Sequence, residues 1–220
     1  MKIQLTKKTE CRRLTFSGWL CVLLFLTILL FLIFRNIHSF LAVSKPIRAD
    51  ILVVDGFLPK YAYDTIVRII ERDNYKYVIT TGVEMDYVYT QSDGYNNAES
   101  SYEILLTKKI KNCRIEKAPA GKALKDRTFS SAIALRKWLI TKGLDHQNLN
   151  LISIGCHARR SWVLYQKAFE GDQKIGVISI QDQSYEPDRW YEFSQGVRIV
   201  LSETIGYTYN IFFFHPKVVL

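Results

Sequence analysis

Residues 155–160, Gly-Cys-His-Ala-Arg-Arg, place an imidazole and two guanidinium groups directly after the apolar run at residues 151–154. An apolar run followed by a helical pattern predicts a buried strand that leads into a helix. The carboxyl ends of parallel strands border the ligand crevice of open α/β sheets, and the next helix points its first N–H groups there. A histidine and two arginines at this position favour an anionic ligand. The alternative is that His157 caps or packs locally while Arg159 and Arg160 lie on a solvated helix face.

Other polar residues are expected at the same edge, because they follow apolar runs or begin a helical pattern. Each has a local explanation, since Asp55 can cap a turn, Thr128 can cap its helix and Arg127 can pair with the preceding acid. Together, their carboxylate, hydroxyl and guanidinium groups can hold a phosphate or a sugar. The residues are Asp55, Thr80, Thr81, Arg127 and Thr128.

At this edge of the sheet we expect His157 to act as general acid or base, since the ordinary pKa of histidine, about 6.5, suits either role. Arg127 and Arg160 would hold the anion, and Asp55 would orient a partner group. Cys156 invites a competing hypothesis, in which its thiolate attacks an acyl group. Adjacent residues of an extended strand point to opposite faces, which disfavours proton sharing between Cys156 and His157.

The pattern that positions these residues alternates strand and helix across residues 49–214. It predicts an α/β fold, a three-layer Rossmann-like domain with a mostly parallel sheet, preceded by one N-terminal transmembrane helix. About 170 residues can bury one core. Strands are expected at residues 50–55, 77–81, 114–117, 151–154 and 174–180, the third being short and weak, and helices at residues 60–73, 98–111, 128–142, after residue 157 and within 193–214.

Two segments of this domain have open interpretations. Residues 84–97 form a polar, tyrosine-rich connection that is long enough to be a lid or rim of a site, or an ordinary surface insertion. The tail at residues 193–214 is apolar, but Arg198 and Glu203 interrupt it, so a second membrane span is not expected. We expect a helix packed on the domain, and its end at residues 211–214 either joins the core or touches a bilayer.

Residues 16–34 form a run of nineteen residues without a charge. At ~1.5 Å per residue this run spans roughly 28 Å, enough to cross the hydrocarbon core of a bilayer. The apolar part of a cleavable signal peptide is shorter, about 7–15 residues. We therefore expect an uncleaved anchor, with residues 1–15 as a short cytoplasmic N-terminus, residues 35–48 as a linker and residues 49–214 as the α/β domain.

The distribution of charge predicts the orientation of the chain in the membrane and argues against nucleic acid as a partner. Five basic residues precede the span and three follow it closely, so the N-terminus is expected in the cytoplasm and the domain outside the inner membrane, periplasmic or extracellular. Of the net charge of +9, +7 belongs to residues 1–48 and +2 to the rest. The domain thus lacks the basic footprint of nucleic-acid binding. The bilayer is the expected partner.

The cysteine and histidine spacings predict neither a disulfide framework nor a zinc site. Cys11 and Cys21 lie in or beside the anchor, which leaves Cys113 and Cys156 in the domain, both expected as free thiols. The four histidines are scattered along the chain, with no Cys-x-x-Cys or His-x-x-x-His spacing. We expect no bound metal.

Several of these positions together resemble the YdcF/SanA/ElyC-like envelope family, over nearly all of residues 49–214. Its membrane-anchored branch carries an Asp-Arg-Thr-aromatic segment and a Gly-x-His-Ala-Arg-Arg-Ser segment, which are similar to residues 126–129 and 155–161. The matching residues are Asp55 and Gly56, Thr81 and Gly82, Glu99, Arg127 and Thr128 with Ala132, and His157 with Arg159 and Arg160.

This resemblance implies a Rossmann-like domain and a role in envelope maintenance, through polysaccharide or peptidoglycan-precursor metabolism. Members have been linked to S-adenosylmethionine, but a periplasmic domain would rarely meet it, so no cofactor is expected. Two functions remain open. One is binding or processing of a phosphorylated or glycosylated, lipid-linked precursor. The other is a non-catalytic scaffold or glycan-binding module.

Overall fold

A computed structural model of the chain describes residues 13–84, 96–171, 173–216 and 218. It divides into two compact units, Met1–Asn36 and Ile37–Leu220. Helix α1 (Phe16–Leu41) contains the expected anchor and extends seven residues beyond its expected end at Phe34. Its 26 residues contain an 18-residue window with a mean hydropathy of 2.7, so it is long and apolar enough to cross a membrane. Large apolar side chains are exposed along residues 16–34.

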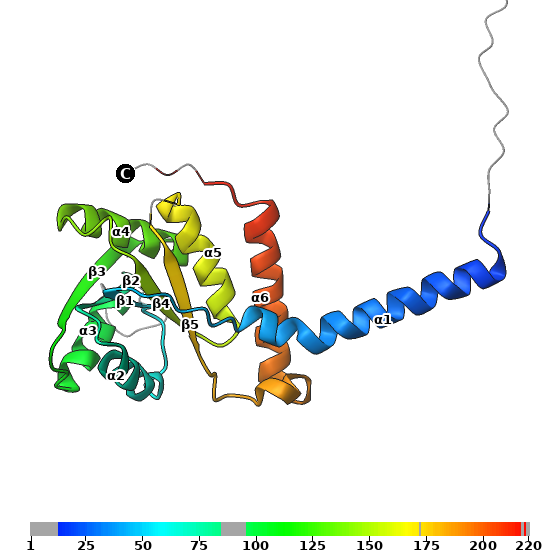
Figure 1. Ribbon diagram of the computed structural model, residues 1–220, viewed down its shortest axis with the longest axis horizontal. Coiled ribbons are helices and arrows are strands. Elements are labelled where there is room, and N and C mark those ends of the chain that lie inside the picture. The colour runs from blue at the N-terminus through cyan, green and yellow to red at the C-terminus, as the bar shows by residue number, and fades with distance from the viewer. Residues whose placement is uncertain (1–12, 85–95, 172, 217, 219–220) are drawn as a thin grey trace, which may run out of the picture. The chain divides into compact units, whose positions relative to one another are not determined.

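The second unit is built on a five-stranded, all-parallel sheet, which confirms the expected α/β class (Figure 1). Its order is β3-β2-β1-β4-β5, so the chain moves outward from β1 to β3 and then returns to the other side of β1. The direction of winding therefore reverses between β1 and β4. The strands are β1 (Ile51–Val54), β2 (Tyr77–Glu84), β3 (Arg114–Lys122), β4 (Leu149–Ile154) and β5 (Ile175–Ile180).

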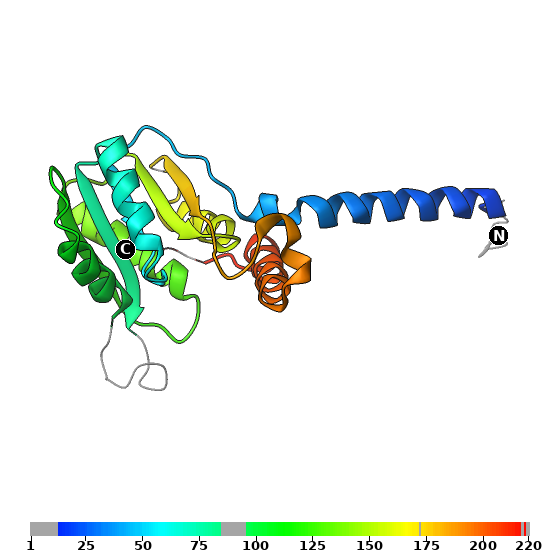
Figure 2. The ribbon, with the colours of Figure 1, turned by 90° about the horizontal axis from the view of Figure 1, so that it is seen from below.

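Helices cover both faces of the sheet, which makes three layers (Figures 1 and 2). Side chains of α2 and α3 share one apolar cluster with the sheet, and those of α4 and α5 share the other. The connections that follow β1 and β2 thus use one face, and those that follow β3 and β4 use the opposite face. The helices are α2 (Ala62–Asp73), α3 (Asn97–Thr107), α4 (Arg127–Thr141) and α5 (His157–Phe169).

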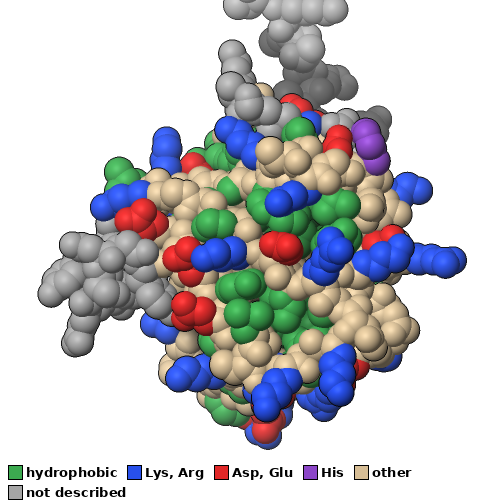
Figure 3. Space-filling model, turned by 90° about the vertical axis from the view of Figure 1, so that its left-hand side faces the viewer, with side chains coloured by type: hydrophobic (Ala, Val, Ile, Leu, Met, Phe, Trp, Pro, Cys, Tyr) green, Lys and Arg blue, Asp and Glu red, His purple; other side chains and the backbone are tan. Residues whose placement is uncertain are grey.

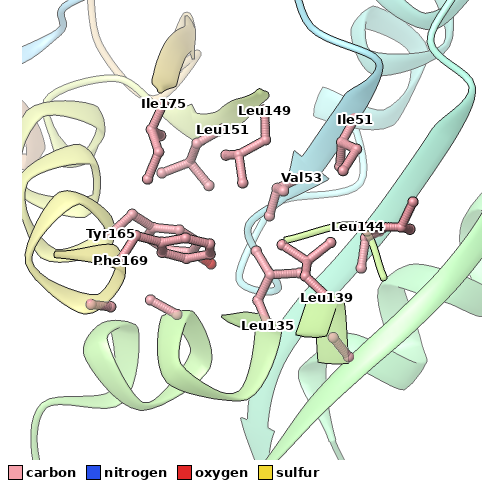
Figure 4. Close-up of a cluster of buried hydrophobic side chains, with 14 residues drawn as sticks. Ile51, Val53, Leu135, Leu139, Leu144, Leu149, Leu151, Tyr165, Phe169 and Ile175 are labelled. Carbon is pink, nitrogen blue, oxygen red and sulfur yellow. The ribbon is translucent and has the colours of Figure 1, made fainter. Parts of the chain in front are cut away.

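The cluster between the sheet and α4 and α5 is one of the two main apolar cores of this unit (Figure 4). Leu135 and Leu139 of α4 are fully buried, four residues apart, and therefore lie on one face of that helix. Tyr165 and Phe169 of α5 repeat the same spacing and stack with their ring centroids 6.5 Å apart. Truncation of either leucine to alanine is expected to cost about 2–5 kcal/mol.

The strand boundaries differ from the sequence expectation at the outer edge of the sheet. The third strand, expected to be short and weak at residues 114–117, is the nine-residue β3 and pairs along the whole of β2. Its turn-like Pro119 and Gly121 are tolerated because β3 is an edge strand. Thr81 and Gly82 lie inside β2 and not after it. Of the expected loop at residues 84–97, residues 85–95 lie outside the described residues.

The end of the domain consists of the 3₁₀ segment η1 (Pro187–Glu192) and helix α6 (Ser194–Phe212). The expectation of a helix within residues 193–214 is confirmed, whereas η1 was not foreseen. Residues 37–41, at the end of α1, belong to the same unit and pack with η1 and α6. Leu41 is fully buried in this cluster beside Val200.

The segment between α1 and β1 is tied to the sheet. Lys45 and Val177 of β5 form an antiparallel bridge. The Asn150 side chain accepts a hydrogen bond from the Ile47 backbone N–H at 2.9 Å and donates to its carbonyl oxygen at 2.8 Å. Residues 45–47, expected as part of a linker, are therefore held by β4 and β5.

Candidate functional site

The candidate site lies where the winding of the sheet reverses. Asp55 follows β1, and residues 155–157 lead from β4, its neighbour in the sheet, into α5. Ligands of open α/β sheets bind outside the carboxyl ends of the strands at such a reversal, because the two adjacent connections leave to opposite faces and open a crevice. Asp55 and His157 therefore meet at this edge because of strand order, not sequence proximity.

Asp55 is a buried carboxylate that accepts hydrogen bonds from two serine hydroxyl groups. Its residue is only 8% exposed. Its Oδ2 accepts hydrogen bonds from Ser161 Oγ at 3.1 Å and from Ser153 Oγ at 3.3 Å. A buried carboxylate is tolerated when it is hydrogen-bonded in this way. The two serines come from β4 and α5, so the elements that carry the site also hold Asp55 in place.

His157 lies between two carboxylates. Its Nδ1 is 3.1 Å from Oε1 of Glu203, and its Nε2 is 3.7 Å from Oδ2 of Asp55. The first distance is a hydrogen bond, whereas the second is too long for one. The imidazole is 24% exposed, so solvent or a ligand can reach it. The ring is thereby oriented by α6 on one side and presents its other nitrogen towards Asp55.

Arg160, one helical turn after His157, is bound by Glu203. Its Nε and Nη2 donate to the two carboxylate oxygens at 2.6 and 3.1 Å, a bidentate pair, and Nη2 is also 3.0 Å from His157 Nδ1. Burial disfavours the charged form of Glu203, but the hydrogen bonds and positive charges of His157 and Arg160 outweigh it and lower the pKa of Glu203 to about 2. Glu203 is therefore an anion at neutral pH.

Glu203 is the functional residue that sequence reasoning missed. The sequence alone shows Glu203 only as a charge that interrupts an apolar tail. It lies on the inward face of α6, with Gly196, Val200 and Asn210, which are buried. A Cβ on Gly206, one turn later, would lie 2.9 Å from Cδ of Arg160, so this glycine makes room for the arginine. The sequence does contain a signal for it, because Glu203 falls on the same side of a helix as these buried positions.

Arg159 has a different environment from Arg160. Its guanidinium lies 3.8 Å from the centroid of the Phe40 ring, and its Nε donates to the Phe40 carbonyl oxygen. A cation near the C-terminus of a helix is favourable there, because it satisfies an orphan carbonyl group. Arg159 thus binds the end of α1, and the structure does not bring it together with Asp55 and His157.

Thr81 and Gly56 make packing contacts where β1 and β2 lie side by side, next to the site. The Thr81 hydroxyl is fully buried, 2.8 Å from the Tyr165 hydroxyl and 3.3 Å from the Val54 carbonyl oxygen. Burial and then the charge of Asp55 raise the pKa of Tyr165. A Cβ on Gly56 would lie 1.9 Å from the Thr81 carbonyl oxygen, so only glycine fits there. These residues pack the strand ends together.

The remaining predicted site residues lie along the β2 and β3 half of the sheet. A Cβ on Gly82 would lie 2.6 Å from the Ala98 nitrogen, so this glycine lets α3 approach β2. The Thr80 hydroxyl donates to the Ala98 carbonyl oxygen at 2.7 Å.

Glu99, expected before a helix, lies in the first turn of α3 and pairs with Lys117 at 2.8 Å. Arg127 and Thr128 begin α4 after β3, which is separated from β1 by β2. Arg127 is exposed, and the structure does not join it to the His157 cluster.

Cys156 is a fully buried thiol in contact with the Tyr185 hydroxyl. It is the N-cap of α5 with a helical φ of −63°, so the argument that Cys156 and His157 alternate on a strand was wrong. Its Sγ lies 3.5 Å from the Tyr185 hydroxyl, which is also 3.1 Å from Nε2 of His38. Burial raises the pKa of Cys156 to about 11. The thiolate population at neutral pH is therefore very small, which disfavours the nucleophile hypothesis.

Among the described residues, no group of three or more His, Cys, Asp or Glu side chains is placed to hold a metal ion. A polar depression of about 410 Å³ occurs at the opposite end of the strands, beside Arg48, Asp50 and Lys76. On the face drawn in Figure 3, basic and acidic side chains are interspersed and form no single basic patch. No protein-family model, curated protein or solved structure matches this chain.

Proposed function

We propose that this chain is a membrane-anchored envelope protein whose extracytoplasmic α/β domain binds and processes a phosphorylated or glycosylated, lipid-linked precursor in cell-wall or exopolysaccharide metabolism. The observation that carries the proposal is the placement of His157 between Asp55 and Glu203 at the reversal of the sheet. The resemblance to the YdcF/SanA/ElyC-like family supports the same assignment. In this proposal His157 is the acid–base group of the site.

The acid–base role follows from the two nitrogens of the ring. We assign the ring proton of His157 to Nδ1, from which it is donated to Oε1 of the ionised Glu203; in this tautomer the 3.0 Å contact between Arg160 Nη2 and Nδ1 is not a hydrogen bond. The Nε2 lone pair is then available to take a proton from a ligand hydroxyl or from water. The imidazolium that forms would be stabilised by Glu203 on one side and Asp55 on the other, as carboxylates do for other catalytic histidines.

Arg160 can contribute to ligand binding while it orients Glu203. Its Nε and Nη2 are used by the carboxylate, and within the described part of the chain its Nη1 has no hydrogen-bond partner. The Arg160 side chain is 28% exposed. A phosphate or sugar oxygen can therefore bind to Nη1. The N-terminus of α5, which begins at His157, offers backbone N–H groups to the same ligand.

The test uses the full chain in lipid nanodiscs that contain candidate lipid-linked precursors, with products read by mass spectrometry. His157→Gln should lower turnover by about 10²–10⁴-fold, the usual contribution of a general acid or base. His146→Gln is the matched control, because the His146 side chain is 93% exposed and, among the residues that the structure describes, pairs only with its neighbour Asp145. Turnover by His157→Gln at the wild-type rate would reject the acid–base role.

A second function is favoured by the closed hydrogen-bond network itself. Because Glu203 binds His157 and Arg160 together, this network also fastens α5 to α6 and could serve a non-catalytic scaffold or glycan-binding module. Binding of a precursor without any product, equal in wild type and His157→Gln, would support this alternative. A double variant, His157→Ala with Arg160→Ala, that stays folded and fully complements the envelope phenotype would reject any role of the site.

A further inference from the structure

The outer face of α6 is an exposed apolar stripe. Its side chains are 54% exposed at Leu201, 69% at Ile205, 48% at Tyr209 and 67% at Phe212, and Phe213, which follows the end of the helix, is 73% exposed. The first four are spaced by four, four and three residues, which places them on one side of a helix. A contiguous apolar surface of this kind marks an interaction site. We call these five residues the α6 stripe.

The opposite face of the same helix carries Glu203, a residue of the candidate site. Glu203, which binds His157 and Arg160, points inward between buried Val200 and Asn210. All residues of α6 are described, and Glu203 is its one acid. The α6 stripe therefore faces outward without an acidic group of its own helix. The exposed cation at Arg198 lies near its N-terminal end.

A short stretch of chain connects the α6 stripe to the expected anchor. Residues 37–41 pack on α6, with the Phe40 ring edge-on to the Tyr207 ring at a centroid distance of 5.3 Å. Phe40 follows Phe34, the end of the uncharged run, by six residues, which span at most about 20 Å even when fully extended. The length of this connection therefore limits how far α6 can lie from the end of the uncharged run.

We propose that the α6 stripe lies on the surface of the bilayer that holds α1. The proposal rests on the membrane anchoring that is part of the proposed function. Lipid fits the composition of the stripe, because aromatic residues concentrate at membrane interfaces and an apolar helix face buries itself at the level of the headgroups. As a consequence, the Glu203–His157 pair on the inner side of α6 would face a ligand whose lipid part remains in the membrane.

The experiment measures contact between α6 and lipid in the full chain. In a background with Cys11, Cys21 and Cys113 replaced by serine, Ile205→Cys is labelled with a bimane fluorophore. The protein is placed in phosphatidylcholine nanodiscs with and without bromine atoms near the headgroup end of the acyl chains. Arg68→Cys on α2, which is also exposed, is the matched control. Resistance of buried Cys156 to labelling verifies the fold.

Loss of most of the Ile205 label's fluorescence in brominated discs, with the Arg68 label unchanged, is the expected result. Equal fluorescence of the Ile205 label in both kinds of disc would overturn the proposal. Disulfide-linked dimers of Ile205→Cys in discs that hold two chains, without quenching, would assign the stripe to a second copy and also overturn it.

The assay contains no precursor, so its failure leaves the His157 experiment unaffected. If the chain did not co-elute with the discs at all, the anchoring itself would be rejected, and with it both proposals. The two proposals are thus separated by different readouts.

Discussion

Oε1 of Glu203 lies 3.1 Å from Nδ1 of His157, although 46 positions separate the two residues in the sequence. Arg160, one turn after His157, binds the same carboxylate through two nitrogens. Helix α6 is therefore part of the candidate site as well as a cover for α5. The Glu203 side chain is only 13% exposed, so its contacts are shielded from water and should have measurable energies.

Replacement of this carboxylate should destabilise the domain. Glu203→Gln keeps the shape of the side chain but leaves Arg160 and His157 opposite a neutral amide, and we expect a loss of about 1–3 kcal/mol in the free energy of unfolding. Urea unfolding of the full chain in detergent, followed by tryptophan fluorescence, measures it. Glu192→Gln, which breaks the exposed pair with Arg189, is the control and should change little. Equal losses in both variants would contradict the buried network.

The same group predicts how stability depends on pH. The pKa of Glu203 is lowered from 4.5 to about 2, so its contribution is fully present above pH 4.5 and is lost as the pH falls from 4.5 to 2. The difference in unfolding free energy between wild type and Glu203→Gln should therefore shrink as the pH falls through this window. Other carboxylates titrate in both proteins and cancel in the difference. A difference that does not change between pH 5 and pH 2 would show that Glu203 is not paired.

Gly206 should be energetically coupled to the ion pair. A methyl group there would lie 2.9 Å from Cδ of Arg160, so Gly206→Ala should displace Arg160 from Glu203. In the Glu203→Gln background the pair is already lost, and alanine should stabilise α6 by up to about 1 kcal/mol as a better helix former. A double-mutant cycle on unfolding free energies should give a coupling of about 0.5–3 kcal/mol. Ser202→Ala, on the exposed side of α6, is the control, and its change in unfolding free energy should add to that of Glu203→Gln. If the change caused by Gly206→Ala also adds to that of Glu203→Gln, the coupling is refuted.

Cys156 should behave as a buried structural thiol. With a pKa raised to about 11, about one molecule in a thousand carries the thiolate at pH 8. We expect iodoacetamide to modify Cys156 only after denaturation, as read by peptide mass spectrometry. Cys156→Ser should keep any activity that His157→Gln abolishes. Rapid alkylation in the native state, or loss of activity in Cys156→Ser alone, would restore the nucleophile hypothesis.

Much of the architecture followed from local patterns. The strands expected at residues 50–55 and 151–154 are found as the buried or mostly buried β1 (Ile51–Val54) and β4 (Leu149–Ile154), and the helical stripes of α2 and α4 cover the sheet where their spacing indicates. These patterns are reliable because burial depends on the period of apolar residues, a local property. The weakly patterned β3 was underestimated, since its length depends on pairing with β2. Such pairing is a non-local contact.

The order of residues was sufficient to place Asp55, Gly56 and His157 at one edge, because parallel strands that alternate with helices end at the same side of the sheet. We expect Arg160 to hold the anion, but the order of residues gives no physical reason to prefer it to Arg159. These neighbours differ by about 100° around α5, so one reaches Glu203 and the other reaches Phe40. Which of them faced the site depended on where α6 and the end of α1 packed, and those positions arise from contacts between distant segments. The tertiary structure alone decided that His157 has Glu203 as its partner.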